Sequence, residues 1–194
     1  MNLTQAPKCL VIVVVYLMLL GIFRIVGDTY CLLWLPLLRA ELTWLLPVDA
    51  LTDISVTMRA GEQVYLAQIA LDKLPTSAFG NNISVIATVS ALSGNVVQSL
   101  LIVLTLVLAT NKLDVRRKCR ALPGTIVIVV LLFSLDLPWV MRGAVEDLWC
   151  AQKMAGCLPT SNLSRYGFAL DRGGRLALAV LGAWALIESM ARKK

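Results

Sequence analysis

Long apolar stretches alternate with polar connections along this chain of 194 residues. Four stretches are apolar over most of their length, and they cover residues 9–29, 94–110, 122–140 and 174–190. The hydrocarbon core of a bilayer is about 30 Å thick, which a helix crosses in about 20 residues. We therefore expect four transmembrane helices. No small-residue cleavage site follows the first of them, so it is expected to remain as an anchor.

The segment between the first two spans, residues 30–93, has a different pattern. Apolar and polar residues alternate over 53–59 and again over 63–69, and the turn-forming sequence Ala-Gly-Glu separates the two runs. A third alternating run covers 82–91. Alternation with a period of two is typical of strands that bury one face. We therefore predict an antiparallel sheet of three strands, which is too small to bury a core alone.

Two further segments have helical character. Residues 31–46 could continue the first helix or lie along the membrane interface, with bends at Pro36 and Pro47, and we favour an interfacial helix. In the connection that follows the third span, apolar residues at helical spacing predict a short amphipathic helix over 144–154. Pro138 is expected to kink or end the third span.

Composition places the chain among polytopic membrane proteins. Hydrophobic residues make up 58% and charged residues 15%, with a mean hydropathy of +0.78. Soluble domains have about 45–50% apolar and about 25% charged residues. The net charge of +6 does not indicate a nucleic-acid partner, because the basic residues are sorted by their position relative to the spans.

This sorting predicts the orientation of the chain. The connection 111–121 and the tail 191–194 are strongly basic, whereas acids and bases balance in the segments 30–93 and 141–173. Lysine and arginine close to spans are retained in the cytoplasm, so both ends of the chain are expected inside. The bases of the connection are read as a topology signal or as a contact with anionic lipids. They are Lys112, Arg116, Arg117, Lys118 and Arg120.

Ionisable residues within apolar spans are costly and are candidates for a functional role. Arg24 and Asp136 lie at similar depths in the first and third spans. We expect an ion pair between these helices. The alternatives are a polar site for an ion, a lipid headgroup or a peptide, and snorkelling of each side chain to water. Glu188 lies four residues before Arg192, which predicts an ion pair on one helix face.

The residue types of this chain support little catalytic chemistry. The chain contains no histidine, whereas Cys-His and Ser-His-Asp catalysis need an imidazole base and most zinc and haem sites have a histidine ligand. No phosphate-binding loop is present. We therefore expect no enzyme activity, no cofactor and no metal. Cys150 and Cys157 lie in one outer segment, where an oxidising compartment would allow a disulfide between them.

The order of the predicted elements resembles that of a known family. One anchor, an outer strand hairpin, a strand leading into the second span, a basic turn and two further spans are similar to the small membrane proteins that accompany bacterial exosortases, notably exosortase H. The resemblance is carried by residues 54–109, in particular Ile-Ser-Val-Ile-Ala-Thr-Val-Ser-Ala-Leu at 83–92, which leads through Gly94 into the apolar residues 100–108. It implies a non-catalytic companion of a membrane transpeptidase or protease that processes C-terminal sorting signals.

These features predict a non-catalytic accessory or structural subunit of a bacterial inner-membrane complex, such as sorting or secretion machinery, with other integral membrane proteins as partners. Small residues of the fourth span would pack closely against a partner or within the chain's own bundle. Two alternatives stay open. A small transporter or channel component would use Arg24 and Asp136. A eukaryotic four-span surface protein would carry glycans at Asn82 or Asn162.

Overall fold

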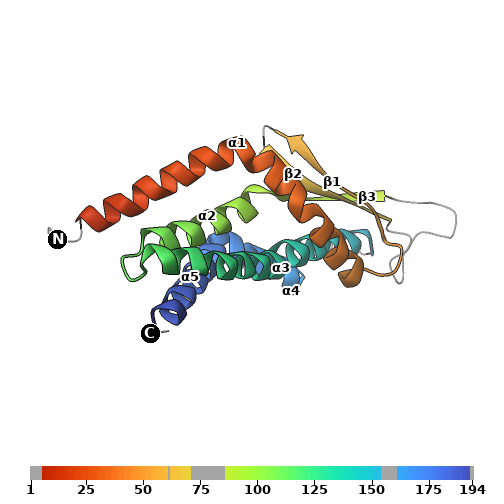
Figure 1. Ribbon diagram of the computed structural model, residues 1–194. Helices are drawn as coiled ribbons and strands as arrows, with labels where there is room; N and C mark the ends of the chain where they lie inside the picture. Colours follow the sequence, from red (N-terminus) through yellow and green to blue (C-terminus); the bar gives the residue numbers. More distant parts are fainter. Residues whose placement is uncertain (1–5, 61, 71–85, 154–160, 193–194) are drawn as a thin grey trace. The chain divides into compact units, whose positions relative to one another are not determined.

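Helices make up most of the structure, a computed structural model that describes residues 6–60, 62–70, 86–153 and 161–192 (Figure 1). In chain order the elements are α1 (Ala6–Leu45), β1 (Leu51–Arg59), β2 (Glu62–Ala70), β3 (Ile86–Leu92), α2 (Gly94–Ala109), α3 (Val115–Lys153), α4 (Asn162–Ala169), a π-helical turn (Leu170–Gly174) and α5 (Arg175–Arg192). The chain forms two compact units. Unit 1 comprises Met1–Gly27, Asn95–Phe133 and Gly173–Lys194, and unit 2 comprises Asp28–Gly94 and Ser134–Arg172.

Three helical stretches among the described residues are long and apolar enough to cross a membrane, namely Leu10–Gly27, Val115–Ala151 and Asn162–Arg192. They indicate a multi-pass membrane protein. The remaining expected span is α2, an apolar helix of 16 residues. Its length is about 24 Å, less than the hydrocarbon thickness of about 30 Å. The mainly helical fold with three membrane-length apolar helices is confirmed, and a fourth crossing stays a prediction.

The predicted sheet is confirmed in the part of the chain that the structure describes. It has three antiparallel strands in the order β1-β2-β3. Tyr65 on β2 is aligned with Val56 on β1 and with Ala91 on β3. Ala67 and Val89, which share that face, are buried together with Tyr65, so this face points into the core. Residues 82–85, expected at the start of the third strand, lie outside the described residues.

Helix α1 is longer than expected. It runs without interruption from Ala6 to Leu45, so residues 31–45 continue the first helix and the separate interfacial helix expected over 31–46 does not form. Pro36 lies inside α1, where the ring removes one backbone hydrogen bond. The burial of Leu38 and Leu42 on the same part of α1 offsets that loss by removing apolar surface from water.

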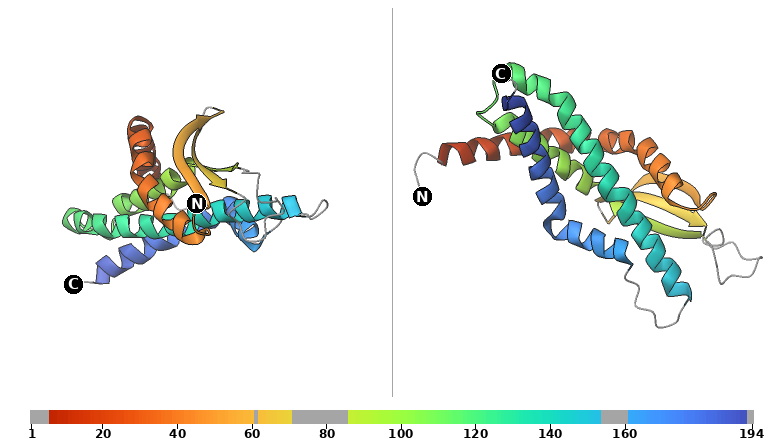
Figure 2. Two further views of the ribbon diagram at one scale, coloured as in Figure 1. Left: turned by 90° about the vertical axis from the view of Figure 1, so that its right-hand side faces the viewer. Right: turned by 90° about the horizontal axis from the view of Figure 1, so that it is seen from below.

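Tyr65 connects the sheet to α1 within unit 2. Its hydroxyl donates a hydrogen bond of 2.9 Å to the backbone carbonyl of Cys31, and its side chain is fully buried. Figures 1 and 2 show this part of α1 lying along the sheet. Burial raises the pKa of the Tyr65 hydroxyl above its ordinary value, so the group stays protonated and remains a donor.

We expect Tyr65→Phe to lower the free energy of unfolding by about 1 kcal/mol near neutral pH, because one buried hydrogen bond is lost. Only the neutral phenol is favoured in the folded state, whereas the phenol of the unfolded chain ionises above about pH 10, the ordinary pKa of tyrosine. The stability that Tyr65 contributes to the wild-type protein is therefore lost as the pH rises above about 10. The stability difference between the two proteins should therefore shrink between about pH 7 and about pH 11. Thermal unfolding in one detergent measures it, and a difference that grows with pH would contradict this role.

Helix α3 extends beyond the expected span at both ends. It has 39 residues, from Val115 to Lys153, and therefore does not end at Pro138. The amphipathic helix expected over 144–154 is the final part of α3 and not a separate element. Membrane helices tolerate proline where nearby groups supply hydrogen bonds to the freed backbone. The carbonyl that Pro138 frees is that of Ser134, four residues earlier. The hydroxyl of Tyr166 donates a hydrogen bond of 2.7 Å to the adjacent carbonyl, that of Leu135.

In unit 1, α2, the first part of α3, and α5 pack around a buried apolar cluster of Val103, Val107, Leu113, Ala121, Ala179, Ala183, Leu186 and Ile187. Small residues bring α3 and α5 close together. A Cβ atom at Gly182 would lie 2.8 Å from Cγ2 of Ile128, and Ala179 and Ala183 are fully buried. These small residues of the fourth expected span thus pack within the chain's own bundle.

Helix α4 lies in unit 2, in the connection 141–173, where the apolar pattern predicted no second helix. The side chain of Ser161 caps its start by accepting a hydrogen bond of 3.1 Å from the backbone N–H of Ser164. Asp147 of α3 accepts a bond of 2.8 Å from the backbone N–H of Ser161, and another from the hydroxyl of Ser164. Asp147 therefore fixes the first turn of α4 to α3.

Candidate functional site

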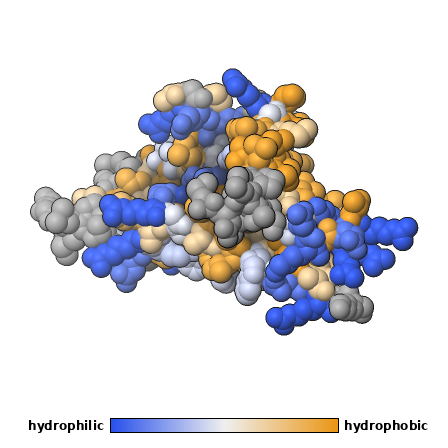
Figure 3. All heavy atoms as spheres, turned by 90° about the vertical axis from the view of Figure 1, so that its left-hand side faces the viewer, coloured by the Kyte–Doolittle hydropathy of each residue, from blue (hydrophilic) through white to orange (hydrophobic). Residues whose placement is uncertain are grey.

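The five bases predicted to lie between the second and third spans are divided between two elements. One is in the short connection between α2 and α3, and four are near the start of α3. Because α3 begins at Val115, only Lys112 lies in the connection. The membrane boundary expected after residue 121 stays a prediction. Positive charge is unfavourable at a helix start and favourable at a helix end. Nζ of Lys118 donates to the carbonyl of Leu108 at the end of α2, which places its charge favourably. Figure 3 shows hydrophilic side chains gathered over this connection and the end of α5.

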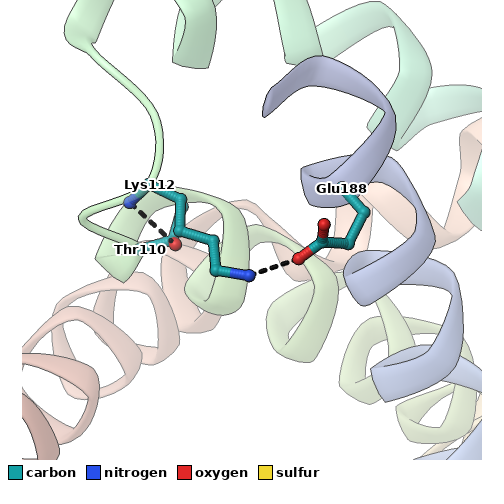
Figure 4. Close-up of polar contacts among 3 residues, drawn as sticks. All are labelled: Thr110, Lys112 and Glu188. Carbon is teal, nitrogen blue, oxygen red and sulfur yellow. Dashed lines mark hydrogen bonds and ion pairs between the residues drawn. The ribbon is translucent and has the colours of Figure 1, made fainter. Parts of the chain in front are cut away.

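An ion pair attaches this connection to α5 (Figure 4). Nζ of Lys112 donates to Oε1 of Glu188, so the expected pairing of Glu188 with Arg192 is corrected. The backbone N–H of Lys112 also donates to Oγ1 of Thr110, at 3.3 Å. The Lys112 side chain is 60% exposed, and exposed pairs contribute little stability. The burial of Leu113 in the unit 1 cluster is the stronger attachment.

Arg24 and Asp136, the candidate intramembrane pair, lie on different units. Arg24 is exposed on the unit 1 part of α1. Asp136 is buried on the unit 2 part of α3, two residues before Pro138. The ion pair between them stays a prediction. The burial of Asp136 on a membrane-length helix keeps this residue a candidate for a functional role.

The candidate disulfide falls partly outside the described structure. Cys150 is half-buried near the end of α3, and Cys157 lies outside the described residues, so the disulfide stays a prediction. Cys31 is buried beside Tyr65, whereas Cys119 is exposed in the first turns of α3. Cys31 and Cys119 therefore differ sharply in their access to reagents.

The N-terminal part of α1 presents apolar side chains on all of its sides. No residue of Leu10–Gly27 is buried by the rest of the described chain. Met18 is 67% exposed and Ile25 is 85% exposed, and the consecutive residues from Leu10 to Val14 are exposed around the helix. In membranes such a surface is covered either by lipid or by the helix of a partner.

Unit 2 contains a cleft of about 180 Å³ that the sequence pattern did not reveal. Its lining is formed by the end of α1, by the two residues that follow it, and by one side of α3; the residues are Leu45, Leu46, Pro47, Arg142, Val145, Glu146 and Trp149. Arg142 and Glu146 form an ion pair between residues four apart on α3. Their spacing was the signal available in the sequence, but apolar periodicity alone does not identify a cleft.

No group of three or more cysteine, aspartate or glutamate residues in the described ranges could hold a metal ion. Comparison with protein-family models, with curated proteins and with solved structures finds no match. The structural arguments for function therefore depend on the exposed part of α1, the basic start of α3 and the cleft in unit 2.

Proposed function

We propose that this protein is a non-catalytic accessory subunit of a bacterial inner-membrane complex and that it contacts its partner through α1. The observation that carries the proposal is the apolar surface of Leu10–Gly27, none of which is buried by the rest of the described chain. In unit 1, the cluster between α2, α3 and α5 buries apolar residues without any contribution from α1. This part of α1 is therefore available to another protein.

Arg24 favours a protein partner over lipid alone. It is exposed on a helix that is otherwise apolar. An arginine in hydrocarbon costs several kcal/mol unless it reaches water or meets an acidic or polar group. A partner helix that carries such a group would remove this cost and would fix the rotation of α1 against it.

The resemblance of residues 54–109 to the companions of bacterial exosortases indicates the class of partner. We propose a membrane transpeptidase or protease that processes C-terminal sorting signals, with this chain as its companion. A chain without histidine lacks the imidazole base that many such enzymes use, which supports an accessory role. The basic start of α3, with Arg116 and Arg120 exposed, supports an inward orientation and contact with anionic lipids.

Site-specific photocrosslinking in native membranes tests the contact. A photoreactive residue is introduced singly at Val14, Met18 and Ile25, which share one face of α1, and at Ile12 and Phe23 on the opposite face. We expect adducts with a membrane peptidase or transpeptidase from one of the two faces only. The matched control is a probe at Val107, which is fully buried in unit 1 and should give no adduct with another protein.

Two results would overturn the proposal. One is the absence of protein adducts at every α1 position, which would leave lipid as the only neighbour of this helix. The other is an adduct with a second copy of this chain alone. In a strain that lacks the protein, we further expect substrates of the partner enzyme to keep their C-terminal sorting signals. Normal processing in that strain would refute the role in sorting even if a contact exists.

A further inference from the structure

The cleft in unit 2 combines apolar walls with one pair of opposite charges. Leu45, Val145 and Trp149 supply apolar surface, while Arg142 and Glu146 supply the charges. Its volume of about 180 Å³ is below the range of about 300–1,000 Å³ of pockets that enclose whole small molecules. The cleft therefore suits one part of a larger molecule whose remainder lies outside.

The ion pair in the cleft keeps hydrogen-bonding capacity for a ligand. Nε of Arg142 donates to Oε1 of Glu146 at 3.2 Å, and both side chains are about one-third exposed. A guanidinium has five N–H donors, and the hydrogen bond recorded for Arg142 with the described residues uses only the one on Nε. The guanidinium carbon also lies 6.0 Å from the centre of the Trp139 ring. Both charged groups are thus held in place while part of each faces solvent.

The number of residues between Arg116 and this pair on α3 matches the distance between the two headgroup layers of a bilayer. Arg142 follows Arg116 by 26 residues on the continuous helix α3, which corresponds to about 39 Å at 1.5 Å per residue. A bilayer including its headgroups is about 40–45 Å thick. If the basic start of α3 lies among the headgroups of one leaflet, Arg142 and Glu146 lie among those of the other.

We propose that this cleft binds a phosphatidylethanolamine lipid. The phosphate accepts hydrogen bonds from the guanidinium of Arg142, and the ammonium donates to the carboxylate of Glu146, so both charges of the headgroup meet their opposites. The first methylene groups of an acyl chain enter the apolar part of the cleft beside Leu45 and Val145. A choline headgroup has no N–H to donate, and a glycerol headgroup has no positive charge, so the site distinguishes these three lipids.

Native mass spectrometry of the full-length protein in mild detergent tests this binding. The probes are phosphatidylethanolamine, phosphatidylcholine and phosphatidylglycerol with identical acyl chains. We expect wild-type protein to retain phosphatidylethanolamine about tenfold better than the other two, the ratio that one charge-assisted hydrogen bond provides. Retention of all three lipids to the same degree would overturn the proposal.

Two single substitutions separate the roles of the charges. Arg142→Gln should lose about tenfold in retention of phosphatidylethanolamine and also weaken phosphatidylglycerol. Glu146→Gln should weaken phosphatidylethanolamine while leaving phosphatidylglycerol equal or stronger, because the carboxylate no longer repels an anionic lipid. The matched control is Arg165→Gln on α4, because Arg165 is exposed and lies outside the cleft. This variant should bind all three lipids as the wild type does.

A folded state is required of each variant and is checked by circular dichroism. If Arg142→Gln folds and retains phosphatidylethanolamine as the wild type does, the proposal is wrong. Inorganic phosphate added in large excess distinguishes a lipid site from an anion site. Displacement of the lipid by phosphate alone would show that the cleft recognises a free anion, and would also overturn the proposal.

Discussion

Replacing Gly143 with alanine is expected to destabilise the protein by about 1–3 kcal/mol, the usual cost of inserting a carbon into a well-packed contact. A Cβ atom at this position would lie 2.8 Å from the backbone nitrogen of Ser164 and 2.9 Å from the carbonyl carbon of Leu163. Both atoms belong to the backbone of α4, which cannot move aside by changing a rotamer. Asp147 also holds this turn of α4 through the Ser161 N–H and the Ser164 hydroxyl.

The matched control for this substitution is Gly21→Ala on α1. Apart from the adjacent residues and the nearby backbone of α1, no atom of the described chain lies within 4 Å of a Cβ at Gly21. Alanine favours a helix over glycine by about 1 kcal/mol. Thermal unfolding by circular dichroism should therefore show a lower midpoint for Gly143→Ala only, by roughly 2–4 °C per kcal/mol. Equal midpoints for both variants would show that the α3–α4 contact is looser than described.

Replacing Gly182 with leucine should separate α3 from α5 and cost about 3 kcal/mol or more, because a four-carbon side chain enters a contact that has no space for one carbon. A Cβ there would lie 2.8 Å from Cγ2 of Ile128. The surrounding cluster also includes Ala179 and Ala183, both fully buried. Neither helix can therefore shift without exposing other packed residues.

A second substitution tests whether the loss comes from this contact. Ile128→Ala removes the side chain that the leucine would strike, so the double variant Gly182→Leu with Ile128→Ala should regain part of the lost stability. The interaction energy from such a cycle isolates the pair when neither single change adds new contacts. If the double variant is less stable than either single variant, the steric explanation fails.

Apolar patterning identified the strands well and the helix ends poorly. The alternation in 53–59 and 63–69 predicted β1 and β2, because a strand with one buried face imposes a period of two. Of the two outcomes expected at Pro138, a helix end is wrong because α3 continues through this residue, and a kink stays a prediction. A proline limits a helix in water more strictly than inside a packed membrane protein, where neighbours such as Tyr166 can supply hydrogen bonds to the backbone.

Helix α4 was missed because its sequence signal is a single polar N-cap residue, whereas the prediction of helices depended on apolar residues at helical spacing. Ser161 has the residue type and position of an N-cap, and its side chain accepts a hydrogen bond from Ser164 three residues later. That signal was present in the sequence. The helix has only eight residues and its packing depends on Gly143 and Asp147 of α3, which are distant in sequence.

The partner predicted for Glu188 was wrong. Glu188 was matched with Arg192 because residues four apart on a helix are neighbours. The structure pairs it with Lys112, from a connection 76 positions earlier. Long-range pairing follows from how α2, α3 and α5 pack in unit 1, and a single sequence contains no direct signal of that packing.

The short helix α2 has a consequence for how the chain is made. Leu10–Gly27 can leave the translocon and remain in lipid without any partner from its own chain, because it is apolar apart from Arg24 and has a mean hydropathy of 2.7. Helix α2 has buried polar residues, Ser99 and Thr105, and a length of 16 residues. It is poorly suited to enter lipid alone. We therefore expect α2 and α3 to enter the bilayer together as a helical hairpin, after α1 has already been inserted.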